Sequence, residues 1–310
     1  MQVDVVIPAY NAARWLPEAI RSALGQTRPP TRVIVVDDGS EDETSAVLRT
    51  FRGEVVSLHH AKNRGLPAAR NTGILAGSSE LLAFLDADDV WAREKLEKQL
   101  PEFDGPDPPG LSYTSLFDCD AELRPLGPPR PFQRRVRRDV FCELYLQAFP
   151  IPPSTVIVRR RVFDACGLFD ESMLKAQDLE FWLRVAMRFT VSCLPEPLCY
   201  RRANAQSITM AAGFERHTHF ALRAFELCAQ AAAAAGVPLP ADTEERKATF
   251  LRRSLREALR RGDREAARFF VGKLMSAGRY RRRDRMVCAA LRARTRLCRP
   301  LQQLSRRPRT

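Results

Sequence analysis

The chain has no apolar stretch near the roughly 20 residues that a helix needs to cross a bilayer. Its eight cysteines contain no Cys-x-x-Cys pair and no spacing typical of metal ligands. The only apolar stretch near the N-terminus is interrupted by Asp4, Pro8 and Asn11, so no signal peptide is expected. These absences argue against a membrane-spanning protein and against a disulfide framework. They predict a cytoplasmic protein of bacterial type with reduced, largely buried cysteines.

Lysine is also scarce, because arginine supplies 44 of the 50 basic residues. Residues 241–310 hold 22 Lys or Arg against 7 Asp or Glu, a net charge of +15, whereas the whole chain carries +13. Residues 1–240 are therefore close to neutral. This partition, together with the length of the chain, predicts two domains: residues 1–212, and a basic α-helical region of residues 213–310.

The basic region has apolar residues at helical spacing. Gly262 and Gly278 are expected to end two helices, and Asp263 to cap the second of them. Further helices are expected at 214–235 and 282–299. The charge has two interpretations: a solvated basic face, or a surface that docks on an anionic membrane. Nucleic acid is not an expected partner, since aromatic residues are not interleaved with the basic ones. The apolar positions are Phe250, Leu251, Leu255, Ala258 and Leu259, then Ala266, Ala267, Phe270, Val271 and Leu274.

Strands alternate with helices along the first ninety residues. Short β-branched or apolar runs at 3–7, 32–36, 55–58 and 81–85 predict strands, and 14–24 and 66–76 predict helices. Ser40 with Glu43 resembles a capping box, which predicts a helix that begins there. Such alternation is typical of parallel pairing through right-handed crossovers. Further strands are expected at 111–117, 151–158 and 190–194. The predicted fold is α/β, with a mostly parallel sheet flanked by helices.

Polar side chains follow three of these strands at the point where each strand ends. The strand at 81–85 is followed by Asp86, Asp88 and Asp89, the strand at 32–36 by Asp37-Asp38, and the first strand by Pro8-Ala9-Tyr10-Asn11. In an open α/β sheet such ends line one crevice, where ligands bind. Paired carboxylates there suit Mg²⁺ or Mn²⁺, which share oxygen ligands with substrate phosphates. The pattern predicts a nucleotide pocket. The alternative is that the acids at 86–89 cap a helix beginning near Ala92.

In these strand ends and in several further motifs, the chain resembles family 2 of the glycosyltransferases, which have the GT-A fold. The resemblance extends over about residues 2–210, and its motifs occur in the family's order. They are Val5–Asn11, Val36–Ser40, Asn63–Asn71, Phe84–Asp89, Gly167–Glu171, Asp178–Arg184, and Tyr200-Arg201 followed by Ser207–Thr209. Any single motif is weak evidence, but seven in order over two hundred residues are strong evidence for the family.

The resemblance implies a role for each matching position on the donor side. Tyr10 matches the aromatic residue that packs on the nucleotide base, with Pro8 beside it, and Asp38 matches the carboxylate for base or ribose. Arg70 falls where the family often has a basic residue facing the diphosphate. Asp86 and Asp88 match the D-x-D pair, with Asp88 as the direct metal ligand and Asp86 nearer the ribose. The alternatives are core cover for Tyr10, a turn cap for Asp38 and a solvated helix residue for Arg70.

The resemblance also implies an inverting mechanism in which Asp178 is the general base. In the family a glutamate usually precedes this residue, whereas here the position is Gln177, a change that removes a charge beside the base and keeps the base itself. Trp182 lies on the same helix side as Asp178, four residues on, and either floors the acceptor sugar or fills the core. Asp178 itself has the alternative of capping the helix through Arg188.

The expected function is thus hexosyl transfer from a nucleotide-sugar, with UDP-sugars favoured, to a hydroxyl of a glycan or lipid-linked acceptor, using Mn²⁺ or Mg²⁺. Such acceptors are typical of cell-envelope polysaccharide synthesis and would place the protein at the inner face of the membrane. Two other classes stay open. A sugar-nucleotide nucleotidyltransferase needs a glycine-rich phosphate loop after the first strand, and residues 8–13 contain no glycine. A non-catalytic scaffold would be favoured by the loss of Asp88 or Asp178, and both are present.

Overall fold

The computed structural model describes residues 1–130, 135–137, 140–145, 151–203 and 214–278. The chain forms two compact units, one of Met1–Gly213 with His219–Leu239, and one of Phe214–Thr218 with Pro240–Thr310. The boundary predicted between residues 212 and 213 lies outside the described residues, so the functional division into domains stays a prediction. Among the described helices, none combines the length and the apolar character needed to cross a membrane.

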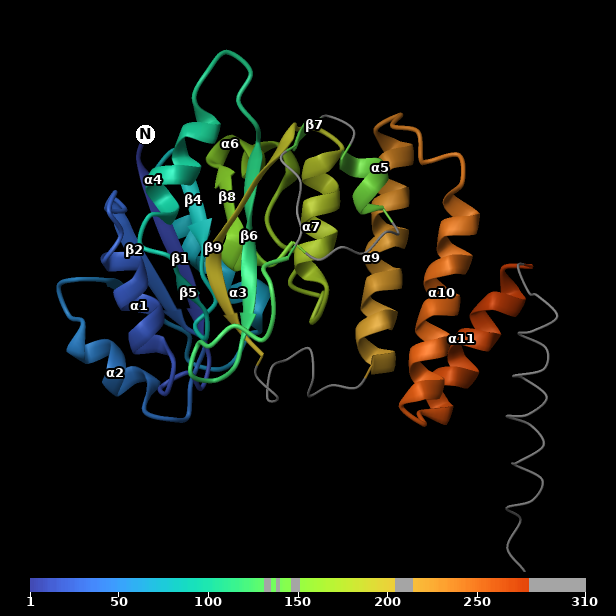
Figure 1. The fold of residues 1–310 in the computed structure, drawn as a ribbon, viewed down its shortest axis with the longest axis horizontal. Coiled ribbons are helices and arrows are strands. Elements are labelled where there is room, and N and C mark those ends of the chain that lie inside the picture. Colours follow the sequence, from blue (N-terminus) through green and yellow to red (C-terminus); the bar gives the residue numbers. More distant parts are fainter. Residues whose placement is uncertain (131–134, 138–139, 146–150, 204–213, 279–310) are drawn as a thin grey trace, which may run out of the picture. The chain divides into compact units, whose positions relative to one another are not determined.

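Within the described residues, nine strands of the first unit form one mixed sheet (Figure 1). Strands β3 (Val56–His59), β2 (Arg32–Asp37), β1 (Val3–Ala9) and β4 (Leu81–Phe84) are parallel neighbours in that order, as the sequence predicts. The remaining strands continue from β4 in a mixed arrangement. They are β8 (Val156–Arg159), β6 (Leu111–Cys119), β9 (Val191–Arg202) and β5 (Val90–Trp91), with β7 (Arg135–Arg137) paired to β9. The prediction of parallel pairing is therefore confirmed for these four strands, and among the remaining pairs β6 and β9 are also parallel.

Helices cover both faces of this sheet because successive strand residues point to opposite sides. Val5, Ile7, Ala83 and Leu85 share a buried cluster with residues of α1 (Leu16–Leu24), α2 (Thr44–Thr50) and α4 (Lys95–Gln99). On the other face, α3 (Leu66–Ala76) lies so close to β1 that a Cβ on Gly73 would sit 2.4 Å from a methyl of Val6. The same face carries α6 (Arg160–Cys166) and α7 (Gln177–Ala186), whose aromatic rings pack on Phe84.

The turn after β2 shows where local sequence signals mislead. The predicted capping box is wrong, because α2 begins at Thr44 and no side chain caps it. Instead, the Ser40 backbone N–H donates to Asp37 Oδ1 at 3.0 Å, and Ser40 Oγ accepts from the Asn11 backbone N–H at 2.9 Å. Gly39 makes this turn at φ +73°, and a Cβ there would lie 2.5 Å from the backbone of Lys62. The turn is thus built around Asp37 and the neighbouring loop, and the helix starts only after it.

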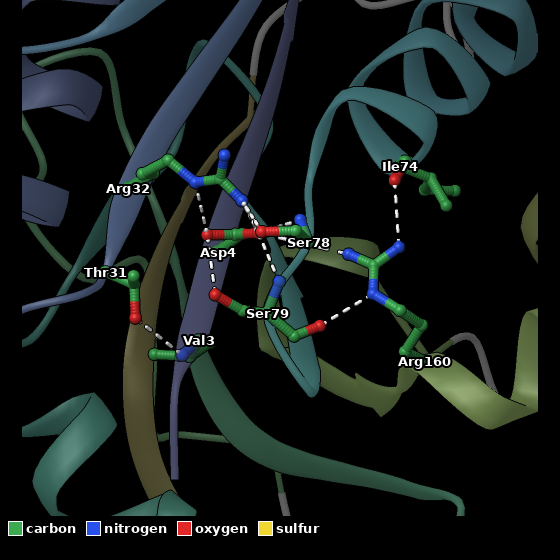
Figure 2. Close-up of polar contacts among 8 residues, drawn as sticks. All are labelled: Val3, Asp4, Thr31, Arg32, Ile74, Ser78, Ser79 and Arg160. Atoms are coloured by element: carbon green, nitrogen blue, oxygen red, sulfur yellow. Dashed lines mark hydrogen bonds and ion pairs between the residues drawn. The ribbon is translucent and has the colours of Figure 1, made fainter.

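The edge of the sheet where β1 and β2 begin is closed by a buried carboxylate (Figure 2). Asp4 is fully buried and accepts hydrogen bonds from Arg32, from the backbone N–H groups of Ser78 and Ser79, and from the Ser79 hydroxyl. Arg160 lies on the far side of the same cluster, 3.9 Å from Asp4. These contacts join the starts of β1, β2, β4 and α6 into one network. The parallel strands β1, β2 and β4 all start at this network. Pro8, Asp37 and Asp86 lie at the opposite, carboxyl ends of the same strands.

The later elements follow the predicted ranges with two main differences. The strand predicted at 190–194 continues through two prolines to Arg202 as β9, and the start of the strand predicted at 151–158 is a 3-10 turn, Pro153–Thr155. Two other helices of the chain are α5 (Val140–Leu144) and α9 (Phe214–Ala234). A 3-10 turn, Leu100–Phe103, follows α4.

The second unit contains α10 (Thr243–Arg260) and α11 (Arg264–Ser276). Asp263 caps α11 by accepting the Ala266 backbone N–H at 3.0 Å, as predicted, and the five predicted apolar residues of α11 are all buried. On α10, Leu259 is 40% exposed and so does not belong to the buried face to which the sequence assigned it. The helix predicted at 282–299 lies outside the described residues.

Candidate active site at the carboxyl ends of β1, β2 and β4

The first strand ends beside the second, in register. Pro8 is buried opposite Val36, and Ala9 lies opposite Asp37. Tyr10 then leaves the sheet and is 45% exposed, so core cover does not describe it. An exposed phenol ring at the end of a central strand offers a flat apolar surface on which a base can stack.

Asp38 is buried and is held by the protein's own backbone. Its Oδ1 accepts the Arg64 N–H at 2.9 Å and lies 2.6 Å from His60 Nδ1, and its Oδ2 accepts the Gly65 N–H at 2.8 Å. His60 Nε2 in turn lies 2.9 Å from the Thr72 hydroxyl of α3. The carboxylate therefore fixes the loop that leads into α3. Sequence reasoning missed His60, since a single histidine after a short strand carries no spacing signal.

Asp37 is a second buried carboxylate of this turn that the sequence did not single out for a role. Burial alone would raise its pKa, but hydrogen bonds from Ser40, Ser45 and His59 outweigh that effect and hold the pKa below its ordinary value. The Ser45 hydroxyl donates at 2.7 Å. Asp37 is thus charged at neutral pH and ties the turn to α2.

The turn after β4 brings Asp86 against Arg70 of α3. The guanidinium Nη2 donates to Asp86 Oδ1 at 2.7 Å, and the arginine side chain is 1% exposed while that of Asp86 is 29% exposed. Arg70 also lies over the ring of Phe169, 5.6 Å from its centroid. Its Nε and Nη1 have no hydrogen-bond partner in the part of the chain that the structure describes. Buried N–H groups without a partner are costly, so this arginine is suited to an anionic ligand.

Asp88 and Asp89 complete the same turn in different environments. Asp88 is half-buried, whereas Asp89 is 2% exposed. Burial, followed by the charges of Asp88 and Asp86, raises the pKa of Asp89 well above its ordinary value. Asp89 accepts the Ser154 hydroxyl at 2.5 Å and the Arg202 backbone N–H at 3.2 Å. The third acid of the motif thus lies in the interior, and the first two are nearer the surface.

The donor set at this turn fits a divalent cation that is shared with a ligand. No three His, Cys, Asp or Glu side chains of the described residues form a metal-binding group. Mg²⁺ is commonly bound through one or two protein carboxylates, with substrate phosphates and water supplying the other oxygens. Asp86 and Asp88 match that requirement in number and in ligand type. The arrangement is suited to a metal–diphosphate complex and unsuited to a closed all-protein metal cage.

Helix α7 is fixed to β4 by aromatic packing. Phe84 contacts the rings of Phe169 and Trp182 at centroid distances of 5.7 and 6.5 Å. Trp182 is 2% exposed and its indole N–H donates to the Ile151 carbonyl at 3.0 Å, which favours the core-filling alternative over an acceptor floor. Because Phe84 lies two residues before Asp86, this packing holds α7 against the strand that carries the turn.

Asp178 occupies the first turn of α7 and is half-buried. Its Oδ1 accepts the Leu179 backbone N–H at 2.8 Å. Ala176, two residues before Asp178, has φ +54°. This left-handed conformation is uncommon for alanine and often occurs at functional sites. The place of Asp178 in the first turn of α7 puts the carboxylate near the positive end of the helix dipole.

Comparison with known proteins identifies relatives of this arrangement. The model of the family described as glycosyl transferase family 2 matches residues 4–167. An uncharacterized glycosyltransferase of Rickettsia prowazekii is 30% identical over 218 residues, which cover 68% of this chain and 66% of that protein. One from Rickettsia bellii is 31% identical, over 67% of this chain and 30% of its own length. The chain thus spans less than two thirds of the length of these curated relatives. A putative teichuronic acid biosynthesis glycosyltransferase of Bacillus subtilis, TuaG, is 39% identical over 103 residues, 32% of this chain and 40% of its own length.

Solved structures share the fold. TarS residues 1–349 of S. aureus in complex with UDP-GlcNAc superposes with a TM-score of 0.57 at 18% identity, covering 91% of this chain and 93% of that one. A mannosyltransferase of Pyrobaculum calidifontis in complex with GDP-Man and Mn²⁺ gives a TM-score of 0.58 at 19% identity, covering 96% of this chain and 81% of that one. At these identities the likeness establishes the architecture of the sheet and its flanking helices.

Proposed function

Because the chain belongs to glycosyl transferase family 2, we propose that it is an inverting, metal-dependent glycosyltransferase. It moves a hexosyl group from a nucleotide-sugar to a hydroxyl of a glycan or lipid-linked acceptor. The observation that carries this proposal is the pairing of Asp86 with a buried arginine, Arg70, whose Nε and Nη1 have no hydrogen-bond partner among the described residues. An anionic ligand would supply the acceptors that these nitrogens lack.

The chemistry of the transfer explains why these residues are needed together. The bond between the anomeric carbon and the phosphate oxygen breaks, and the diphosphate leaves with the electron pair. Asp86 and Asp88 would hold a divalent cation there, which would stabilise the negative charge that develops on that leaving group. Arg70 contributes a second positive charge on the protein side, fixed in place by Asp86 and by the Phe169 ring. Tyr10 and Asp38 are the residues proposed to hold the base and the ribose.

Asp178 is proposed as the general base. As the acceptor oxygen forms its bond to the anomeric carbon, its proton passes to the Asp178 carboxylate, and the configuration at that carbon is inverted because a single displacement occurs. Two features support this role: the position in the first turn of α7, which favours the charged carboxylate, and the packing of α7 on β4 through Trp182 and Phe84. Gln177, which precedes it, is buried.

The donor is proposed to be a UDP-sugar, and the proposal is tested directly with purified protein. TarS binds UDP-GlcNAc and the Pyrobaculum mannosyltransferase binds GDP-Man, so UDP-, GDP- and dTDP-sugars are compared. Slow hydrolysis of each donor is followed in 1 mM Mn²⁺ and in EDTA. Hydrolysis that is specific for one nucleotide and lost in EDTA is expected. A protein that neither binds nor hydrolyses any of these donors would contradict the proposal.

Contact with an anionic membrane is proposed for the second unit, since lipid-linked acceptors reside in membranes. Arg253, Arg256 and Arg260 are exposed at spacings that place them along one side of α10, and Arg264 and Arg268 are exposed on α11. Each basic residue near an anionic surface contributes about 1 kcal/mol, weakened by salt. Sedimentation with phosphatidylglycerol liposomes at low and high salt tests this proposal. A full chain that ignores such liposomes at low salt favours the alternative of a solvated basic face.

A further inference from the structure

The turn that carries the two proposed metal ligands is clamped by a buried serine from a distant part of the chain. Ser154 lies in the 3-10 turn before β8, is fully buried, and contacts the turn after β4 with its hydroxyl. We propose that Ser154 is a positioning residue that sets the placement of Asp86 and Asp88 for the metal–diphosphate complex. This inference rests on the proposed function.

The direction of the first of the two hydrogen bonds is fixed by chemistry. The Asp86 backbone N–H can only donate, so it donates to Ser154 Oγ, at 3.0 Å. The single hydroxyl proton is therefore available for Asp89 Oδ2, which lies 2.5 Å away. One hydroxyl thus joins the first and last residues of the turn, in addition to the backbone bond from the Asp89 N–H to the Asp86 carbonyl at 3.0 Å. Asp88 lies between these two fixed points.

The backbone around Ser154 is itself fixed by hydrogen bonds from other elements, so the serine can hold the turn in place. The Trp91 indole N–H donates to the Ser154 carbonyl at 2.7 Å. The Gln99 side-chain amide donates to the next carbonyl, that of Thr155, at 3.1 Å. Pro152 and Pro153 precede the serine and restrict the backbone there. A hydroxyl on this segment has little freedom to follow a moving turn, and the turn is therefore held in one conformation.

A second clamp acts on the other side of the same turn. Arg202, at the end of β9, donates its backbone N–H to Asp89 at 3.2 Å and its Nη1 to the Asp88 carbonyl at 2.9 Å. Its guanidinium is 2% exposed and also contacts Glu18 and the ring of Trp15. Ser154 fixes the ends of the turn and Arg202 fixes its middle. The backbone of the turn is thus held from two sides, and the Asp86 carboxylate is held in addition by Arg70 at 2.7 Å.

Residues that orient metal ligands without touching the metal typically contribute a factor of about 10 to 100 in metal affinity. Loss of the Ser154 hydroxyl leaves the Asp86 N–H without its acceptor and Asp89 without one donor. The turn then becomes free to relax, and the two carboxylates lose their spacing. We expect the affinity for Mn²⁺ in the presence of UDP to fall by about tenfold, whereas the affinity for UDP without metal changes little.

The experiment measures Mn²⁺ binding by the signal of free Mn²⁺ in electron paramagnetic resonance, with saturating UDP, and metal-free UDP binding by calorimetry. Ser154→Ala is compared with Ser192→Ala. Ser192 is a matched control because it is also fully buried in the same sheet, and its hydroxyl has no hydrogen-bond partner among the described residues. Ser154→Thr and Ser154→Val form a second pair. Threonine and valine have the same shape and differ only in a hydroxyl against a methyl group. The difference between the two variants therefore isolates the hydroxyl even where the added bulk destabilises the fold.

The expected pattern is weakened Mn²⁺ binding in Ser154→Ala and Ser154→Val, with Ser154→Thr tighter than Ser154→Val and Ser192→Ala like the unaltered protein. Equal binding by Ser154→Ala and the unaltered protein overturns the inference, and so does equal impairment of the Thr and Val variants. A parallel loss of metal-free UDP binding also overturns it, because a general structural defect then explains the result. An unaltered protein that takes up no Mn²⁺ with UDP, GDP or dTDP overturns the proposed function first.

Discussion

Replacing Asp4 with asparagine should destabilise the first unit strongly, although Asp4 is at the edge of the sheet opposite to the candidate site. The carboxylate is fully buried and accepts five hydrogen bonds, three at Oδ2 and two at Oδ1 (Figure 2). An amide of the same shape has one acceptor oxygen and one NH₂ group. With the NH₂ group in place of Oδ1, the Arg32 Nε–H faces another donor, because the Ser79 hydroxyl can turn to accept. With the NH₂ group in place of Oδ2, three donors face it.

The magnitude follows from two independent estimates. Breaking a buried ion pair by neutralising one partner costs about 3–5 kcal/mol. Leaving even one buried donor without an acceptor costs about 1–3 kcal/mol. Arg32 is 34% exposed and can turn part of its guanidinium toward water. The expected loss in the free energy of unfolding is therefore near the lower end, about 3 kcal/mol at pH 7.

The pH dependence has a definite sign. Burial alone would raise the pKa of Asp4, but hydrogen bonds from Arg32, Ser79 and Ser78 outweigh it and lower the pKa. A carboxyl group whose pKa is lowered by folding stabilises the folded state above its unfolded pKa of about 3.9, and this contribution is lost as the pH falls through the folded pKa. The difference between the unaltered protein and Asp4→Asn should thus be complete at pH 6–7 and shrink below about pH 4.

Urea unfolding followed by tryptophan fluorescence measures this change in the first unit, because Trp15, Trp91 and Trp182 all lie in it. Glu80→Gln is the matched control. Glu80 adjoins the same cluster, is 52% exposed, and pairs with Arg159 at 2.7 Å, so its loss should cost less than about 1 kcal/mol. A loss in Asp4→Asn no larger than that in Glu80→Gln would refute the reasoning.

Three further predictions concern the site and its support. Asp88→Asn should lower metal-dependent donor hydrolysis by about 10² or more with unchanged urea unfolding, and near-normal turnover would remove Asp88 from the metal site. Asp178→Asn should keep calorimetric donor binding but slow transfer by about 10² to 10⁴, and full transfer at saturating donor would exclude it as the base. Burial lowers the pKa of Lys95 to about 7, so between about pH 7 and 10.4 the unfolded chain binds the extra proton and stability rises with pH. Lys95→Met should therefore have a higher urea midpoint than the unaltered protein at pH 7. The difference between the two midpoints should narrow toward pH 9.5. A difference that stays constant with pH would contradict the lowered pKa of Lys95 as its cause.

Much of the N-terminal half could be predicted because its signals are local. The helix at 66–76 matches the structure at both ends, and the parallel strands fall within one or two residues of their predicted ranges. Their apolar periodicity, with Gly and Pro at the boundaries, reflects burial on both faces of the sheet. The acids at the strand ends were found for the same reason, since charge directly after a buried strand stands out in a sequence.

The contacts that organise these acids could not be predicted, because they join residues far apart in the chain. Ser154 lies 65 residues after Asp89, and the bond from Arg202 to Asp88 spans 114 residues. A serine after two prolines and an arginine at the end of a strand carry no local signal for such roles. The capping box of Ser40 and Glu43 fails for a related reason, since Asn11, 29 residues earlier, donates to the Ser40 hydroxyl. Tertiary partners override the local preference.

The contacts of Arg202 with the turn have a consequence for when the candidate site can assemble during synthesis of the chain. A ribosome that adds about 5–20 residues per second reaches position 202 about 6 to 23 s after it has passed position 88. During that interval the nascent chain already holds every acid of the turn, yet β9 and its arginine are missing. The centre is thus assembled late, by the last strand of the sheet, although the residues of that turn are among the first to emerge. A chain interrupted at residue 167, the end of the matched family region, would keep the acids and lose the clamp.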